Sequence, residues 1–481
     1  MKHHKNDPAI PEAFLSRMEG LLVAEYSDFY KSLFQPALVG LRINTLKLSP
    51  ADYCSQSPFQ LSRVPWCPSG YMVKAIGEDS DLITPGKHPH HTAGLYYLQE
   101  PSSMAAAEIL AAHPGEKVLD LCAAPGGKAT HLAALMNNKG LLVANEIHPK
   151  RVWDLAENLE RCGATNTVVL NETPEHLAAH FPEYFDRVLV DAPCSGEGMF
   201  RKTEIARQEW KPQLVLSCAV RQSSILELAA RMVRPGGHLA YTTCTFSAEE
   251  NEGVVAKFLV RHPEFELVCI PSIPGIQPAR PDWIDLSPDH KVNRAKRIWP
   301  HHTNGEGHFI ALFAKQVSSS HHWNGRQTQE RLSSYKRKRG GPLVIISDCI
   351  QKFVMENLNL SLNHTRLRID GSYVYYLPEI NPELSGLRVV HPGWWLGSIR
   401  KDRFTPSHAL AMGINSTQVK HTLPLRCDNP LLQLFLAGCS IPDRGTDTWV
   451  LITLDGYPIG WGKRRQGQIR NFYPRGLRLS V

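Results

Sequence analysis

Two cysteines stand where α/β sequences often carry reactive groups. Cys194 follows a predicted buried strand at 185–190, and Cys244 comes directly after a second predicted strand, 237–243. A lone cysteine is usually a small buried apolar residue, but two cysteines in polar turns after strands favour a chemical role. Because the thiolate is the nucleophilic form of cysteine, either residue could form a covalent bond with an electrophilic carbon. Asp191, three residues before Cys194, could stabilise charge that develops on a substrate ring.

A second motif indicates a nucleoside-containing cofactor. The run 118–121 leads into a loop of small residues, Cys122-Ala123-Ala124-Pro125-Gly126-Gly127-Lys128. Such a loop lets a ligand approach the backbone closely. Glu146 follows the next apolar run, 141–144, and an acidic side chain there can accept hydrogen bonds from both ribose hydroxyls. The spacing is neither GxGxxG nor GxxxxGK[ST], which argues against a nicotinamide-dependent oxidoreductase and against a phosphate-binding loop.

These side chains need a scaffold that brings several strand ends together. Between residues 117 and 315, short apolar runs alternate with helical stretches, which is typical of an open, mostly parallel α/β sheet. The runs are 118–121, 141–144, 168–170, 188–190 and 239–242. Ligands of such sheets bind beyond the carboxyl ends of the strands. We therefore expect the glycine-rich loop, Asp191 and both cysteines to share one edge of the sheet.

The length of 481 residues predicts two to four domains. We expect an N-terminal extension at 1–110, a catalytic domain at 111–315 and a basic linker at 316–342. A small α+β module at 343–385 and a last module at 386–481 should follow.

Composition excludes several classes of protein. No run of eighteen apolar residues could span a membrane, and the polar N-terminus leads into no apolar signal core, so we expect a cytoplasmic protein. The eleven cysteines form no CxxC pair and indicate free thiols. His88, His90 and His91 cluster, but no cysteine or carboxylate motif beside them completes a ligand set. We therefore predict no metal site.

Taken together, these motifs resemble those of the Sun-type RNA (cytosine-5) methyltransferases, most of all the bacterial members that modify the RNA of the small ribosomal subunit. The similarity covers about residues 10 to 315. It rests on Arg42-Ile43-Asn44-Thr45-Leu46-Lys47, Gln99-Glu100-Pro101-Ser102-Ser103-Met104, the glycine-rich loop, Asp191-Ala192-Pro193-Cys194-Ser195-Gly196, Thr243-Cys244-Thr245, Arg297-Ile298-Trp299-Pro300-His301 and Gly305-Glu306-Gly307-His308-Phe309. The resemblance implies a Rossmann-like methyltransferase fold and an RNA-binding role for the N-terminal extension, 1–110. It also implies an enzyme that uses S-adenosylmethionine to methylate carbon 5 of a specific cytidine in 16S rRNA.

The resemblance also implies roles for the two cysteines, which the residues alone do not rank. Carbon 5 of cytosine is a poor nucleophile until a thiolate adds to carbon 6. By resemblance, Cys244 is that nucleophile and Cys194 helps to release the methylated RNA. Cys122 to Lys128, Glu146 and Asp191 would contact S-adenosylmethionine, with Lys128 also available for catalysis. Thr173 stands where family members commonly have an aspartate that contacts adenine, and Asn171 is a possible substitute.

The C-terminal third resembles a PUA-like RNA-binding region. This similarity rests on 386–403, with its pair Trp394-Trp395, and on the basic end of the chain. Six basic residues of that end alternate with aromatic ones: Lys463, Arg464, Arg465, Arg470, Arg475 and Arg478, with Trp461, Phe472 and Tyr473. Cations can neutralise phosphates and aromatic rings can stack on unpaired bases, so we expect a substrate-recognition module that is separable from catalysis.

We expect a monomer whose partner is 16S rRNA within the small ribosomal subunit, with no DNA or membrane partner. Two alternatives stay open: a transfer RNA cytosine-5 methyltransferase, and a non-catalytic ribosome assembly factor with the same fold.

Overall fold

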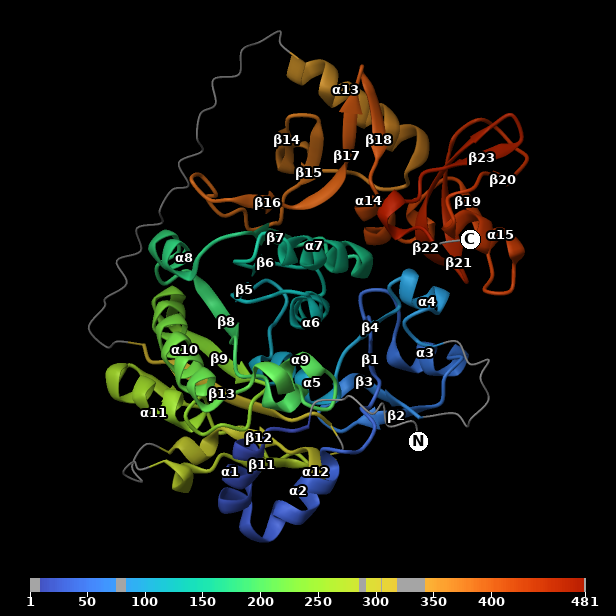
Figure 1. Ribbon diagram of the computed structural model, residues 1–481. Helices are drawn as coiled ribbons and strands as arrows, with labels where there is room; N and C mark the ends of the chain where they lie inside the picture. The colour runs from blue at the N-terminus through green and yellow to red at the C-terminus, as the bar shows by residue number, and fades with distance from the viewer. Residues whose placement is uncertain (1–8, 75–83, 285–290, 304, 318–341, 480–481) are drawn as a thin grey trace.

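The computed structural model describes residues 9–74, 84–284, 291–303, 305–317 and 342–479 (Figure 1). The predicted basic linker, 316–342, lies outside these residues except at its ends. Within the described part of the chain, no helix has the length and apolar character needed to cross a membrane.

A ten-stranded sheet forms the centre of the molecule, and it confirms the predicted Rossmann-like α/β fold. Its order is β11-β12-β13-β9-β8-β5-β6-β7-β16, with β10 paired to β13. The five strands from β9 to β7 are parallel, and the flanking ones are antiparallel. The strands are β5 (Lys117–Asp120), β6 (Leu141–Asn145), β7 (Thr167–Leu170), β8 (Phe185–Asp191), β9 (Val233–Thr243), β10 (Phe265–Leu267), β11 (Ile276–Pro278), β12 (Lys296–Ile298), β13 (His308–Lys315) and β16 (Val389–His391).

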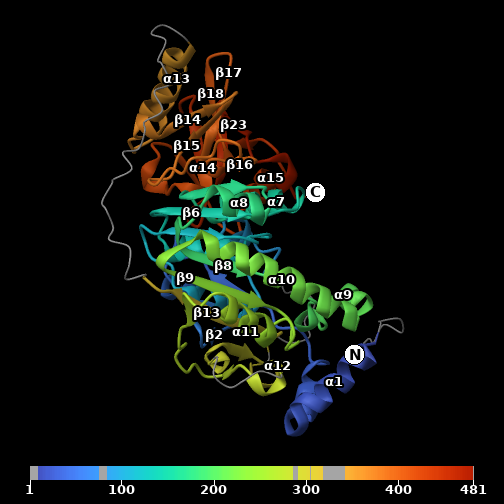
Figure 2. The same cartoon turned by 90° about the vertical axis from the view of Figure 1, so that its left-hand side faces the viewer.

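Helices cover both faces of this sheet. The helices of the region are α5 (Pro101–Leu110), α6 (Gly127–Leu135), α7 (Arg151–Cys162), α8 (Pro174–His180), α9 (Glu204–Glu209), α10 (Pro212–Met232), α11 (Glu252–Arg261) and α12 (Pro300–Thr303). Helices α8, α10 and α11 lie on the face turned toward the viewer in Figure 2, and α5, α6 and α7 pack on the other. Successive residues of one strand point to opposite faces, so Val118 joins one core and Leu119 the other. The central strands are therefore apolar throughout, as in parallel sheets covered on both sides.

The N-terminal extension forms a four-stranded sheet with short helices. Its elements are α1 (Glu12–Leu22), α2 (Tyr26–Ser32), β1 (Gly40–Ile43), α3 (Pro50–Gln56), β2 (Leu61–Val64), β3 (Cys67–Val73), α4 (Pro89–Thr92) and β4 (Tyr96–Leu98). Arg42 on β1 donates to the Gly127 carbonyl (3.0 Å) and the Thr130 hydroxyl (2.8 Å) at the start of α6. The extension thereby supports the glycine-rich loop from outside the catalytic sheet.

The C-terminal third contains two further sheets. Their elements are α13 (Pro342–Asn357), β14 (Leu367–Asp370), β15 (Tyr373–Tyr376), β17 (Trp394–Arg400), β18 (Arg403–Pro406), α14 (His408–Gly413), β19 (Thr422–Leu425), α15 (Pro430–Leu436), β20 (Ile441–Pro442), β21 (Trp449–Leu454), β22 (Tyr457–Arg465) and β23 (Gln468–Asn471). The first sheet has the order β14-β15-β17-β18 and the second β19-β21-β22-β23-β20. Residues 386–481 are therefore not one unit, because β17 pairs with β15, which precedes residue 386, and β18 joins the same sheet through β17.

The C-terminal region contacts the rest of the chain at two places, and its separability from catalysis stays a prediction. Strand β16 pairs with β7 and extends the catalytic sheet. The last sheet also shares a hydrophobic core with the N-terminal extension, in which Leu41 and Tyr53 belong to the same cluster as Phe435 and Val450. Figure 1 shows this sheet directly above α4. Composition identified the basic linker but could not reveal that the apolar faces on its two sides meet.

Candidate active site

The two predicted cysteines meet at the carboxyl edge of the central sheet. Strands β5, β8 and β9 are neighbours, and Cys122, Cys194 and Cys244 follow them in that order. The strand order reverses between β5 and β8, which is where ligands of open α/β sheets bind. The sulfur atoms of Cys194 and Cys244 are 3.3 Å apart. This contact and burial raise the pKa of the Cys194 thiol.

Two cavities adjoin at this edge. The larger, about 640 Å³, contains Glu146 and Cys194 in its wall, and the smaller, about 280 Å³, contains Lys128. Both cavities are lined by Cys122, Ala124, Asp191 and Cys244. Cys244 therefore contacts both spaces, whereas Cys194 lines only the larger one. This arrangement could hold a cofactor on one side and a flat base on the other.

Lys128 and Asp191 form an ion pair beside Cys244. The Lys128 ammonium donates to an Asp191 carboxylate oxygen (2.7 Å) and to the Ser103 hydroxyl (3.1 Å). Thr242 donates to the other Asp191 oxygen at 2.8 Å. Burial opposes both charges, but the attraction between them raises the pKa of Lys128 and lowers that of Asp191. Both groups are therefore charged at neutral pH.

Sequence reasoning missed Glu250, which holds the Cys194 loop in place. Its buried carboxylate accepts from the Ser195 backbone N–H (3.0 Å), from the Ser195 hydroxyl and from Gln222 on α10 (2.8 Å). Burial raises the pKa of Glu250 to about 7, although the Ser195 hydrogen bonds oppose that shift. The only signal for Glu250 in the sequence is the polar run that follows Cys244. Nothing in the sequence links Glu250 to Ser195.

This raised pKa predicts a pH-dependent stability. The folded protein binds a proton on Glu250 that the unfolded chain loses at a lower pH, so this carboxyl stabilises the fold less as pH rises from about 5 to about 8. We expect Glu250→Gln to flatten that decline, because an amide does not titrate. Melting temperatures of both proteins across this pH range provide the measurement. Parallel pH curves would contradict the prediction.

The larger cavity has the side chains that a nucleoside cofactor requires. Glu146 is buried at the end of β6, where its carboxylate accepts from the His148 N–H (2.8 Å) and lies 3.5 Å from Arg151. At Gly126 the φ angle is +116°, and an added Cβ would lie 3.2 Å from Asn158. The loop therefore needs glycine here and keeps its backbone close to α7.

Asp120 is a second group that sequence reasoning missed, because it lies within the apolar run 118–121. Both of its carboxylate oxygens are buried without a hydrogen-bond partner among the described residues. Burial and the neighbouring Asp191 raise the pKa of Asp120 to about 8. Asp120 lines neither cavity, so protonation of its carboxyl group is what lowers the cost of burying it.

Thr173 takes part in a helix cap. Its hydroxyl accepts from the His176 N–H (3.3 Å) at the start of α8, while Pro174 and Glu175 line the larger cavity. Asn171 donates to the backbone carbonyl of Glu146 at 2.7 Å, which fixes the strand end beside the acid. The contact between Thr173 and adenine stays a prediction.

His308 lies in the wall of the smaller cavity. In the sequence it stands out only as a member of the motif Gly305-Glu306-Gly307-His308-Phe309, with no predicted role. Burial and the nearby Lys128 ammonium lower the pKa of His308 to about 4, so its imidazole is neutral.

Comparisons with known proteins cover most of the chain. A family model described as 16S rRNA methyltransferase RsmB/F matches residues 107–314, and the N-terminal domain of 16S rRNA methyltransferase RsmF matches 10–101. The RsmF rRNA methyltransferase first C-terminal domain matches 352–414, and the methyltransferase RsmF PUA domain matches 423–479. Trp394 and Trp395 thus fall in the first of these two C-terminal domains.

Relatives and solved structures agree with these matches. The chain is 32% identical to ribosomal RNA small subunit methyltransferase F of Vibrio vulnificus (strain YJ016), over 97% of each chain. It is 41% identical to the protein of that name from Klebsiella pneumoniae (strain 342), over 54% of this chain and 56% of the relative. A methyltransferase homolog protein from Pyrococcus horikoshii is similar in structure, with a TM-score of 0.56 and 32% identity over 63% of this chain and 95% of that one.

Proposed function

The chain belongs to the 16S rRNA methyltransferase RsmB/F family, and we propose that it methylates carbon 5 of a cytidine in 16S rRNA through a covalent bond between Cys244 and that base. Family membership makes it an rRNA methyltransferase that uses S-adenosylmethionine. One observation supports the finer proposal most strongly. Cys244 lines both cavities, and its sulfur lies 3.3 Å from a second thiol.

The larger cavity fits the cofactor, which supplies an electrophilic methyl group when it is bound. Glu146 would accept hydrogen bonds from the ribose hydroxyls. The loop Cys122-Ala123-Ala124-Pro125-Gly126-Gly127 would contact the cofactor through its backbone, with Asp191 where the two cavities meet and Lys128 in the smaller one. These residues would direct the methyl group toward the space in which Cys244 and the base react.

The side chains beside Cys244 suit each step of the reaction. The Cys244 thiolate adds to carbon 6, which places an electron pair on carbon 5, and that carbon takes the methyl group. The Lys128 ammonium stabilises negative charge near the sulfur, and Asp191 can accept from the exocyclic amino group of the base. In the last step a base takes the proton from carbon 5, either the thiolate form of Cys194, whose sulfur lies 3.3 Å from that of Cys244, or water. The electron pair of that C–H bond restores the double bond between carbons 5 and 6 and expels the Cys244 thiolate from carbon 6.

A methylation assay on defined RNA tests this proposal. Small ribosomal subunits, naked 16S rRNA and transfer RNA from a strain that lacks the gene would be incubated with the enzyme and labelled S-adenosylmethionine. We expect 5-methylcytidine in the nucleosides of 16S rRNA and none in transfer RNA. Label in another nucleoside would contradict carbon 5 as the target, and label in transfer RNA would favour the alternative substrate. No label in any RNA would favour a non-catalytic assembly factor.

RNA recognition is proposed for an exposed basic cluster on the C-terminal sheets, which we define as Arg403, Lys463, Arg465 and Arg470. Three of these residues lower the pKa of the fourth, Lys463, in addition to the effect of its burial. The cluster differs from the one that the sequence suggested. Arg464 is buried in an ion pair with Asp443, and Trp461 and Tyr473 belong to the core. These three residues are therefore structural, and their predicted contact with RNA is wrong.

Charge reversal in the basic cluster should weaken RNA binding without unfolding the protein. We expect Arg465→Glu with Arg470→Glu to reduce affinity and to flatten its salt dependence, by about one unit of log-log slope for each phosphate that is no longer neutralised. Filter binding over a range of salt concentrations provides the measurement. The matched control is Arg368→Glu with Arg426→Glu, which changes the charge equally at exposed positions outside the cluster. Equal effects from both pairs would show that only net charge matters.

A further inference from the structure

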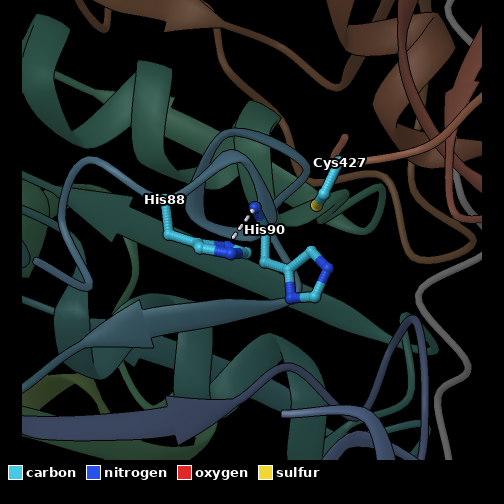
Figure 3. A group of neighbouring side chains, drawn as sticks. All are labelled: His88, His90 and Cys427. Atoms are coloured by element: carbon cyan, nitrogen blue, oxygen red, sulfur yellow. Dashed lines mark hydrogen bonds between the residues drawn. The ribbon is translucent and has the colours of Figure 1, made fainter. Parts of the chain in front are cut away.

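Metal-binding side chains gather where the N-terminal extension meets the last sheet. His88 and His90 stand at the start of α4, and Cys427 follows β19 (Figure 3). One donor atom from each of the three lies within 4.8 Å of the others. Asp455, in the turn between β21 and β22, adds a carboxylate oxygen that is 3.3 Å from His90 Nε2 and 3.3 Å from Cys427 Sγ. Three donors, from His88, His90 and Cys427, therefore lie around one space, and Asp455 contacts two of them.

The spacing of these donors suits a tetrahedral metal ion. In a zinc site with bonds of about 2.0–2.3 Å, tetrahedral geometry separates neighbouring ligand atoms by about 3.3–3.8 Å. Both contacts of Asp455 match that separation. Imidazole, thiolate and carboxylate are the ligands that Zn²⁺ takes in proteins, whereas Mg²⁺ and Ca²⁺ prefer oxygen alone.

The surroundings also favour ligation. His88 and His90 are both buried, so bulk water does not compete with a metal ion for their ring nitrogens. Nδ1 of His90 is buried and makes no hydrogen bond within the described parts of the chain, so it is free to carry the ring proton when Nε2 binds a metal.

We propose that His90, Cys427 and Asp455, with His88 as the fourth ligand, bind one Zn²⁺ that joins the N-terminal extension to the last domain. His88 is the weakest of the four, because its Nδ1 already accepts from the His90 backbone N–H at 3.1 Å and caps α4. The prediction that no ligand completes the histidine cluster rested on neighbours in sequence. His90 and Asp455 are 365 residues apart in the chain and meet only after the domains pack.

Metal analysis of the untagged full-length protein tests the site. We expect about one zinc ion per chain after purification without chelator, since structural zinc sites bind tightly at neutral pH. After zinc removal, Co²⁺ should produce a thiolate-to-cobalt charge-transfer absorption. Zinc should also raise the melting temperature of the stripped protein, because it binds the folded state. Absence of zinc from the purified protein together with no cobalt absorption would overturn the proposal.

Two variants and a control locate the ion. Cys427→Ser and His90→Gln should each weaken zinc binding at least about tenfold, and Cys427→Ser should remove the cobalt absorption. The control is Cys439→Ser, at an exposed cysteine of the same domain, which should bind one zinc ion normally. If Cys427→Ser bound zinc with unchanged affinity, this site would be refuted. The metal would then belong to another cluster, such as Cys67 with Glu108 and His131.

Discussion

Cys244→Ala is expected to abolish both methylation and any covalent complex with RNA, whereas Cys194→Ala should still form that complex and accumulate it. The reason lies in the position of the two thiols. Cys244 lines both the larger and the smaller cavity at the sheet edge, whereas Cys194 lines only the larger one. Without Cys194, the adduct forms but lacks the neighbouring group proposed to assist its breakdown. Denaturing gels of enzyme incubated with labelled RNA and S-adenosylmethionine would show the complex as a shifted band.

A third cysteine serves as the control for this experiment. Cys218 is buried in α10 and lines neither cavity, so Cys218→Ala should methylate RNA at the normal rate and accumulate no complex. If Cys194→Ala abolished the complex and Cys244→Ala accumulated it, the two roles would be exchanged and Cys194 would be the nucleophile.

Removal of the Lys128–Asp191 ion pair should have the second-largest effect. We expect Lys128→Met and Asp191→Asn each to slow methylation by about 10²–10³-fold, the usual loss when a group that stabilises developing charge is removed. Lys128→Met should also lower the melting temperature, since it leaves the half-buried Asp191 carboxylate without its cation. Single-turnover rates and thermal melts separate these two effects.

The double variant distinguishes a catalytic role from a structural one. Lys128→Met with Asp191→Asn removes both charges, so its melting temperature should recover relative to Lys128→Met alone. Its methylation rate should stay as low as that of either single variant. Recovery of the rate together with stability would mean that the pair acts only by maintaining the fold.

The sequence by itself determined the central sheet and the residues at its edge. Each strand from β5 to β9 is apolar on both faces, because helices cover both sides, so the strands stand out as short continuous runs. The side chains after each run meet because the carboxyl ends of parallel strands share one edge. For that reason the order of residues alone was enough to locate Cys194, Cys244 and the glycine-rich loop.

Only the tertiary structure decided which polar groups share an environment. Glu250 and Asp120 were missed because their importance comes from burial, and burial depends on what packs around a residue. The sequence predicts that Arg464 and Trp461 bind RNA. In the structure Arg464 forms an ion pair with Asp443, and Trp461 is part of a hydrophobic core. His88 and His90 lie near Cys427 and Asp455 because the N-terminal extension and the last sheet share a hydrophobic core. Local patterns determine strands and loops, whereas contacts between domains depend on surfaces that the folded chain alone brings together.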